Sequence, residues 1–369
     1  MAAPDESYFA AFPSKPKPYI SYGLTFEKAC AHHAENTFHA SHIYVVVSKS
    51  ISKTEAFTAL QTALANKIVG VRYGILPHTP LEDVLALADD LNAKSPDVII
   101  TLGAGSISDG VKLARLFAAN GVSDTQRAYD IFNKCTVDLA NVVTTAAGVK
   151  PATIPVINVP TTLSAGEFTP FGAATNMQTF EKRNLIHDVD ASALLAFHRS
   201  PSSRPLHRRS ICQFTSREPG VDRRTFNALR DLLVGLLKTK QKWDDFDARL
   251  QTQLALKTAV QNLSCGMGAS HGIGHQLGPM GVGHGETSCI ILPCVMKYNW
   301  DHGDGKVRDS LRMVASAFWD EPAVVEALGL KAADRDSTNP GDLMAAFISA
   351  LGLPRSLSQF ISEAICLIS

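Results

Sequence analysis

Strand-like and helix-like segments alternate through the first half of the chain, and this alternation constrains the fold most. The β-branched segment HIYVVVS (His42–Ser48) precedes the helical KTEAFTALQTALANK, and PDVIITLGAGS (Pro96–Ser106) precedes SDGVKLARLFAANG. VRYGIL and TIPVINVPTT are further strand-like segments, and TPLEDVLALADDLNAK is a helix that Thr79 is expected to cap, with Pro80 at its first position. Strands separated by helices pair in parallel, so the pattern predicts a sheet with helices on both faces.

The second half has a different pattern. From about Thr225 onward the periodicity is helical, and no segment reads convincingly as a strand. The predicted fold is an α/β N-terminal domain with a doubly wound, mostly parallel sheet, plus an all-α C-terminal domain. The predicted parts are a tail (1–22), a dinucleotide-binding α/β domain (23–187), an Arg/Ser/Pro-rich segment (188–224) and an all-helical metal and substrate domain (225–369).

Composition excludes several classes of protein. The formal net charge is +0, which provides no field for nucleic acid or for an anionic membrane surface. The seven cysteines are odd in number and scattered, so we expect a reducing compartment rather than a disulfide framework. We see no apolar signal-peptide core and no run long enough to span a membrane, and we therefore expect a cytoplasmic protein.

A glycine-containing turn follows the strand-like segment at Pro96–Ser106. Gly103, Gly105 and Ser106 stand between a strand and a helix, where backbone N–H groups can reach a diphosphate. The pattern G-x-G-x-x-G is incomplete because Ser108 replaces its last glycine, so a plain strand–helix turn is an open alternative. The spacing G-x-G-S-x-x-D-x-x-K, which adds Asp109 and Lys112, is more specific.

Three histidines lie in ASHGIGHQLGPMGVGHGETSCIILP. If Ser270 caps a helix, His271 and His275 share one of its faces, and His284 follows nine residues later. Gly272 and Gly274 would each cost about 1 kcal/mol in that helix, which makes sense if something approaches the backbone closely. Neutral imidazole binds Fe²⁺ or Zn²⁺, but surface or packing histidines are the alternative. His32, His33 and His39 show no partner pattern and are expected to be exposed.

Together these motifs resemble the iron-containing alcohol dehydrogenase superfamily, which has a dehydroquinate-synthase-like fold. GAGSISDGVK resembles its glycine-rich dinucleotide loop, PTTLSAGE its second coenzyme-contacting loop, and HGIGH, GHGET and LPCVMKYN its metal-site region. The resemblance covers roughly His42–Glu181 and Phe226–Pro354. Within the superfamily, GEFTPFGAATN and the H-x-E-T at His284–Thr287 are more similar to maleylacetate reductases than to alcohol or glycerol dehydrogenases.

The resemblance implies a role for each of these motifs. It implies NAD(H) or NADP(H) as cofactor, with Fe²⁺ or Zn²⁺ as the metal. It makes His271 and His284 metal ligands and His275 a cleft residue that carries a proton. The cofactor-binding residues that it implies are Gly103, Ala104, Gly105, Ser106, Asp109, Thr161, Thr162 and Ser164.

The chain departs from the family pattern in one segment. The superfamily supplies further metal ligands as Asp-x-x-x-His, and neither this motif nor Asn-x-x-x-His occurs in Asp188–Arg230. The apolar residues of His198–Arg224 follow no period, so this segment is a disordered basic loop or a nucleic-acid arm without stacking aromatics. The third alternative is that residues from about Asp190 to Arg224 are the product of a shifted reading frame or a retained intron. We expect a gene-model error of the last kind, an incomplete metal site, weak metal binding and a shortened C-terminus.

The function expected from the sequence is therefore hydride transfer from NAD(P)H to an oxo acid, as in maleylacetate reduction during aromatic-compound breakdown. The alternatives are an iron- or zinc-dependent alcohol or glycerol dehydrogenase and a degenerate cofactor-binding protein with little catalysis. The expected partner is a small-molecule oxo acid or alcohol, and the expected assembly is a homodimer.

Overall fold

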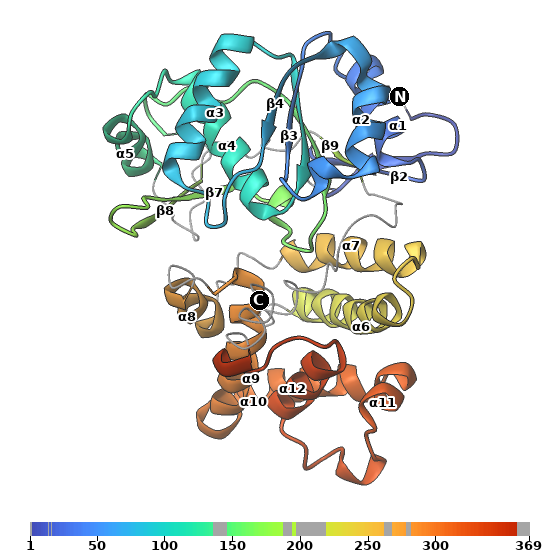
Figure 1. Ribbon diagram of the computed structural model, residues 1–369. Helices are drawn as coiled ribbons and strands as arrows, with labels where there is room; N and C mark the ends of the chain where they lie inside the picture. The colour runs from blue at the N-terminus through green and yellow to red at the C-terminus, as the bar shows by residue number, and fades with distance from the viewer. Residues whose placement is uncertain are drawn as a thin grey trace. The chain divides into compact units, whose positions relative to one another are not determined.

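The computed structural model describes residues 2–13, 15, 17–135, 146–186, 194–196, 219–261, 268–277 and 282–359. The chain divides into two compact units, Met1–Arg204 and Pro205–Ser369. Figure 1 shows an α/β unit that contains the N-terminus and a helical unit that contains the C-terminus.

A seven-stranded, mostly parallel sheet forms the centre of the first unit. Strand β1 pairs with β2 in antiparallel fashion, and every other pairing in the sheet is parallel. This confirms the predicted α/β class. In spatial order the strands are β1 (Ser7–Ala10), β2 (Tyr19–Tyr22), β9 (Leu194–Ala196), β6 (Val156–Pro160), β5 (Val98–Gly103), β3 (Ile43–Val47) and β4 (Ile68–Tyr73).

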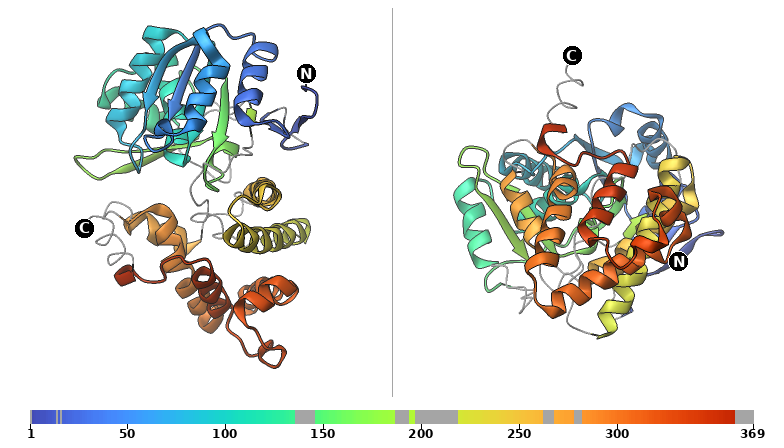
Figure 2. Two further views of the ribbon diagram at one scale, coloured as in Figure 1. Left: turned by 45° about the vertical axis from the view of Figure 1, so that its right-hand side comes forward. Right: turned by 90° about the horizontal axis from the view of Figure 1, so that it is seen from below.

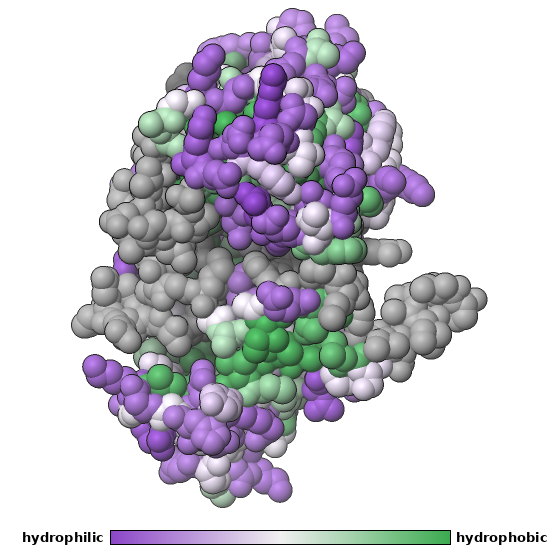
Figure 3. Space-filling model, turned by 90° about the vertical axis from the view of Figure 1, so that its left-hand side faces the viewer, coloured by the Kyte–Doolittle hydropathy of each residue, from purple (hydrophilic) through white to green (hydrophobic). Residues whose placement is uncertain are grey.

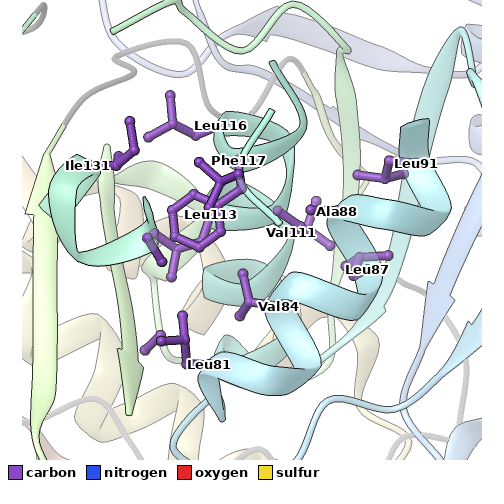
Figure 4. Packing of buried hydrophobic residues seen from close by; sticks show 14 of the residues in the cluster. Leu81, Val84, Leu87, Ala88, Leu91, Val111, Leu113, Leu116, Phe117 and Ile131 are labelled. Carbon is purple, nitrogen blue, oxygen red and sulfur yellow. The ribbon is translucent and has the colours of Figure 1, made fainter. Parts of the chain in front are cut away.

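Helices cover both faces of the sheet because its central strands are apolar on both sides. In β3, Tyr44 and Val46 belong to one buried cluster, whereas the alternate residues Ile43, Val45 and Val47 belong to the other. Figure 4 shows the first cluster, where the buried face of α3 packs against α4. The helices are α1 (Phe26–Asn36), α2 (Glu55–Leu64), α3 (Leu81–Lys94), α4 (Gly105–Ala119) and α5 (Thr125–Lys134).

The direction of the crossovers changes between β3 and β5. After β3 the chain moves outward to β4 at one edge, and after β5 it moves the other way to β6. In open α/β sheets, ligands bind outside the carboxyl ends of the strands at such a switch point. The topology therefore directs attention to the residues that follow β3 and β5.

The ends of the α/β unit differ from the sequence expectation. The expected tail 1–22 contains β1 and β2, which extend the main sheet. The segment 188–224 contains β9, where Leu194 and Leu195 are fully buried between β2 and β6, and its last residues already belong to a helix. Strands of three or four residues carry too little periodicity to be predicted.

Thr79 also differs from its prediction. The helix α3 begins at Leu81 with Pro80 as its N-cap, and Thr79 has a left-handed backbone with φ of 54°. Its buried hydroxyl donates a 3.4 Å hydrogen bond to the carbonyl of Ser106 instead of capping α3. The threonine is used for tertiary contact, which local sequence rules do not capture.

A hairpin of β7 (Phe171–Thr175) and β8 (Lys182–Ile186) completes the described part of the first unit. In the second unit, the described residues form helices and no strand, as the views in Figure 2 show. None of the described helices has the length and apolar character needed to cross a membrane. These helices are α6 (Pro219–Gln241), α7 (Phe246–Val260), α8 (Ala269–Leu277), α9 (His284–His302), α10 (Gly305–Trp319), α11 (Pro322–Leu328) and α12 (Pro340–Ala350).

Candidate functional site

The predicted glycine turn lies at the carboxyl end of β5, beside the switch point. Gly103 ends the strand, Ala104 is the N-cap of α4, and Gly105 is its first residue. The N–H groups of Ile107 and Ser108 both donate to the carbonyl of Ala104, at 3.0 and 3.3 Å. The first amides of a helix have no acceptor within it, and the helix dipole adds partial positive charge there. The turn can therefore bind a diphosphate through its backbone.

Gly103 packs closely against Ile107 and Ser48. A Cβ atom at this position would lie 2.5 Å from Cδ1 of Ile107 and 3.5 Å from Cβ of Ser48. The strand end, the first turn of α4 and the residue after β3 thus meet closely, and a methyl group at Gly103 would displace the end of the Ile107 side chain. Glycine here keeps the α4 N-terminus close to the sheet edge.

Three buried hydroxyls around this edge have no hydrogen-bond partner among the described residues. They are Oγ of Ser48, Oγ of Ser108 and Oγ1 of Thr162. Ser48 follows β3, Ser108 is in the first turns of α4, and Thr162 follows β6. A buried hydroxyl left unsatisfied costs about 1–3 kcal/mol, and such atoms call for an explanation, such as a bound ligand. The donor set therefore fits a ligand with many polar oxygens, such as a dinucleotide.

The second predicted coenzyme loop is attached to the first. The backbone N–H of Thr161 donates to the carbonyl of Gly103 at 3.0 Å, which joins the end of β6 to the end of β5. Further along, the N–H of Gly166 donates to Oγ of Ser164 at 3.5 Å. The structure thus brings Gly103, Thr161 and Thr162 to one edge of the sheet. Their roles in binding stay predictions.

The residues after β3 contain no acid. Ser48 is followed by Lys49 and Ser50, both exposed. An acidic side chain at the end of this strand would repel a 2′-phosphate, and a cation would not. This edge is therefore compatible with NADP(H) as well as NAD(H).

The histidine-containing stretch forms two packed helices in the second unit. His271 and His275 both lie on α8, and His284 is the first residue of α9. His271 is half-buried, whereas the side chains of His275 and His284 lie outside the described residues. The helix begins at Ala269, and the N–H of His271 donates to Gly268, so Ser270 lies inside the helix rather than at its cap.

The two glycines of α8 have different surroundings. A Cβ atom on Gly274 would lie 2.9 Å from Oγ1 of Thr287, a residue of α9 that is 1% exposed. Gly272 is exposed, and a Cβ atom there would meet nothing within 4 Å in the described structure. The sequence predicted that something approaches the backbone of this helix closely. At Gly274 that neighbour is α9, whereas the backbone at Gly272 is exposed.

The described residues do not assemble a metal site. Within them, no group of three or more His, Cys, Asp and Glu side chains could hold an ion. A protein metal site normally needs three or four ligands. The roles of His271 and His284 as metal ligands stay predictions.

The expectation that His33 is exposed is wrong. Its side chain is fully buried, with Nε2 2.6 Å from Oε1 of Glu6 and Nδ1 2.8 Å from Oγ1 of Thr37. Burial lowers the pKa of His33, although the bond to Glu6 opposes this. Glu6 lies 27 residues away on the N-terminal side, so the pair forms only when β1 joins the sheet.

Sequence comparison places the whole chain in a known family. The model of the iron-containing alcohol dehydrogenase family matches residues 23–197, and the model of the C-terminal part of the Fe-containing alcohol dehydrogenase family matches residues 212–360. The chain belongs to the iron-containing alcohol dehydrogenase family. The two matches leave residues 198–211 between them, which falls within the Arg/Ser/Pro-rich segment.

Two curated relatives that match most of this chain are dehydrogenases. The dehydrogenase FUM7 of Gibberella moniliformis is 43% identical over 371 residues, which covers 93% of this chain and 87% of that protein. The dehydrogenase ALT3 of Alternaria alternata is 46% identical over 345 residues, with 86% and 88% of the two chains covered. The chain is therefore a dehydrogenase, and these names do not specify a maleylacetate reductase.

A solved structure shows the same fold. The maleylacetate reductase of Rhizobium sp. strain MTP-10005 has a TM-score of 0.64 and 19% identity, covering 97% of this chain and 87% of that one. At this identity the likeness concerns the fold alone. The family membership of the sequence prediction is confirmed, and the assignment to the maleylacetate reductase branch is not supported by the relatives.

Proposed function

We propose that this dehydrogenase transfers hydride between a nicotinamide coenzyme and a small carbonyl compound, with the coenzyme held at the carboxyl ends of β3, β5 and β6. One observation carries the proposal: three buried hydroxyls without partners in the described structure surround the open N-terminus of α4 at the switch point of the sheet. The family implies a coenzyme of the NAD(P) type and does not distinguish NAD from NADP.

The residues of the chain have separable tasks in this proposal. Backbone amides at Gly105 and Ser106 bind the diphosphate, since these donors lack acceptors within α4. The Thr161–Ser164 loop, attached at Gly103, contacts the part of the coenzyme beyond the diphosphate. The bound nicotinamide supplies or accepts the hydride.

His275 is the residue that we propose to carry the accompanying proton. An imidazole has a pKa near neutrality and can give or take a proton at physiological pH. Replacing it in His275→Ala should lower kcat by about 100-fold or more while coenzyme affinity stays unchanged. His302→Ala, which changes an exposed histidine of α9, is the matched control. Equal kcat values for the two variants would remove this assignment.

The substrate that we propose is an oxo acid, and maleylacetate is the compound to test. Support comes from the sequence features GEFTPFGAATN and H-x-E-T. The proposed role of the enzyme in aromatic-compound breakdown depends only on maleylacetate being the substrate. The second candidate is an alcohol or its aldehyde, which the description of the matched family favours. A homodimer remains the expected assembly.

The deciding experiment is an NADH and NADPH oxidation assay with the purified chain. Maleylacetate should be compared with simple aldehydes at equal concentration, with and without added Fe²⁺ or Zn²⁺. Faster turnover of maleylacetate supports the oxo acid, and faster turnover of aldehydes supports the second candidate. Failure of both coenzymes to bind would reject the proposed function.

A further inference from the structure

Lys112 is a buried cation in the second turn of α4. Its side chain is 7% exposed. Its Nζ donates hydrogen bonds to the carbonyl oxygens of Gly166 at 2.6 Å and of Phe171 at 2.7 Å. A third contact, at 3.4 Å, reaches Oδ1 of Asp109 one turn earlier on the same helix. These three acceptors match the three donors of an ammonium group.

The two carbonyls lie at the two ends of one loop segment. Gly166 opens a short 3-10 helix (Gly166–Phe168), and Phe171 opens β7. Gly166 also accepts bonds from the N–H and the hydroxyl of Thr169, but those bonds stay within the loop. The bonds from Lys112, in contrast, connect the loop to α4.

The loop needs such an attachment because its backbone is unfavourable where it meets α4. Ala165 has a φ of 57°, a left-handed conformation that is disfavoured for residues with a Cβ atom. The next residue, Gly166, packs close to α4: a Cβ atom there would lie 3.7 Å from Oδ1 of Asp109 and 3.8 Å from Oγ of Ser108. Conformations of this kind persist where surrounding contacts hold them.

We infer that Lys112 is a positioning residue that fixes the second coenzyme loop, Thr161–Phe171, against the helix that binds the diphosphate. The inference rests on the proposed function. Lys112 holds one end of this loop through Gly166, while Thr161 holds the other end through its bond to Gly103. The same ammonium orients Oδ1 of Asp109, a predicted coenzyme residue whose side chain is 31% exposed. Lys112 thus acts on the coenzyme through its neighbours, without touching it.

This arrangement predicts that the two parts of the coenzyme depend differently on Lys112. ADP contains the diphosphate and adenosine, which the α4 N-terminus and the β3 side of the sheet would bind. The Thr161–Phe171 loop follows β6, on the opposite side of β5, and would contact the remaining part. Loss of Lys112 should therefore weaken NADH binding and spare ADP binding.

The test measures the Kd of NADH and of ADP for the full chain and for Lys112→Met. We expect the Kd of NADH to rise about tenfold or more, because buried carbonyls lose a charged donor, and the Kd of ADP to change less than about threefold. Lys94→Met, at an exposed lysine in the last turn of α3, should leave both constants unchanged. Lys112→Gln keeps N–H donors on a shorter side chain and should give an intermediate loss, and it replaces the methionine variant if that variant fails to fold.

Two results would overturn the inference alone. The first is NADH affinity in both Lys112 variants within twofold of the unaltered chain, which would show that the loop needs no attachment. The second is an equal loss of NADH and ADP affinity, which would show general destabilisation rather than positioning. If the unaltered chain binds neither NADH nor NADPH, the proposed function fails and this inference fails with it.

Discussion

Two helices of the molecule begin in glycine-containing segments, and the glycines serve different purposes. At α4, Gly103 and Gly105 keep side chains away from the place where backbone amides meet the sheet edge. At α8, Gly274 lets a neighbouring helix approach, and Gly272 leaves an exposed backbone. The same residue type therefore lies at a proposed main-chain binding surface in one unit and at a helix–helix contact in the other.

On one face, the two units differ in the polarity of their described residues. Figure 3 shows mostly polar residues on the visible face of the α/β unit and a group of apolar residues on the visible face of the helical unit. Ile273 of α8 is one of the large apolar side chains exposed in the helical unit, at 45% exposure. The helix with the predicted chemistry, α8, thus carries an exposed apolar side chain.

The largest effect expected concerns Gly105, the first residue of α4. Gly105→Val places a branched side chain where the diphosphate must approach, and should raise the Kd of NADH about 100-fold, or by about 2.7 kcal/mol. Gly305→Val is a matched control, because Gly305 is the first residue of α10 and has open space around it. Fluorescence titration gives both constants. Similar NADH affinity in the two variants would contradict the proposal that Gly105, unlike Gly305, lies where the diphosphate binds.

A smaller effect concerns the choice between NADH and NADPH. Ser48, Lys49 and Ser50 contain no acid, so we expect both coenzymes to bind, with Kd values that differ less than about 100-fold. Lys49→Asp should shift the ratio toward NADH, since an added carboxylate repels the 2′-phosphate. Lys53→Asp, just beyond this turn, provides a charge-matched control. A preference of the unaltered chain for NADH above 100-fold would contradict the absence of discrimination at this edge.

The two glycines of α8 should respond to alanine with opposite signs. Gly272→Ala fills open space in a helix and should raise the free energy of unfolding by about 0.5–1 kcal/mol. Gly274→Ala forces a methyl group against Thr287. The net effect, which includes the gain in helix propensity, should lower the free energy of unfolding by about 1 kcal/mol. Urea unfolding measures both. Equal shifts of the same sign would mean that α9 does not pack against α8 as described.

The buried pair in the α/β unit makes its stability depend on pH. Burial lowers the pKa of His33 below its ordinary 6.5. Burial opposes ionisation of Glu6, but hydrogen bonds from Ser21, the N–H of Ala3 and His33 hold its pKa below the ordinary 4.5. The unfolded chain therefore binds more protons than the folded chain in acid, and stability falls as pH drops below about 6.5.

Thermal unfolding between about pH 7 and pH 5 tests this expectation. The midpoint of the unaltered chain should fall with pH, and His33→Asn, which removes the titrating imidazole, should flatten the slope. His42→Ala is the control, because the side chain of His42 is 58% exposed. If His33→Asn and His42→Ala show the same slope as the unaltered chain, the imidazole of His33 does not titrate differently in the folded state.

The sheet edge that we propose to bind the coenzyme, at the carboxyl ends of β3, β5 and β6, was accessible to sequence reasoning because it depends on the backbone. A buried β-branched strand, a glycine turn and a helix start fix where amides point, and Gly103, Gly105 and Ser106 follow from that pattern. The orphaned hydroxyls of Ser48 and Ser108 and the bonds of Lys112 could not be predicted, because they depend on residues up to 59 positions apart in sequence. The sequence singled out Lys112 only as the last residue of the pattern G-x-G-S-x-x-D-x-x-K. That pattern did not predict which groups accept the hydrogen bonds of Lys112.

The histidine region shows the limit of the same reasoning. Periodicity correctly placed His271 and His275 on one helix, but it could not say which atoms surround them. Ligand sets depend on side chains from separate segments, and the segment expected to complete this one, within 188–224, lies largely outside the described residues. The burial of His33 was missed for a related reason, since its partner Glu6 directly precedes the four-residue strand β1, which has no pattern of its own.

The most direct test of the central claim is amide hydrogen exchange of the full chain with and without saturating NADH. The account predicts added protection in the first turn of α4, at Gly105 and Ser106, and in the Thr161–Ser164 loop, with little change in α1 and α2 on the opposite face of the sheet. Protection confined to other segments while NADH is bound would contradict the assignment of the coenzyme to the carboxyl ends of β3, β5 and β6.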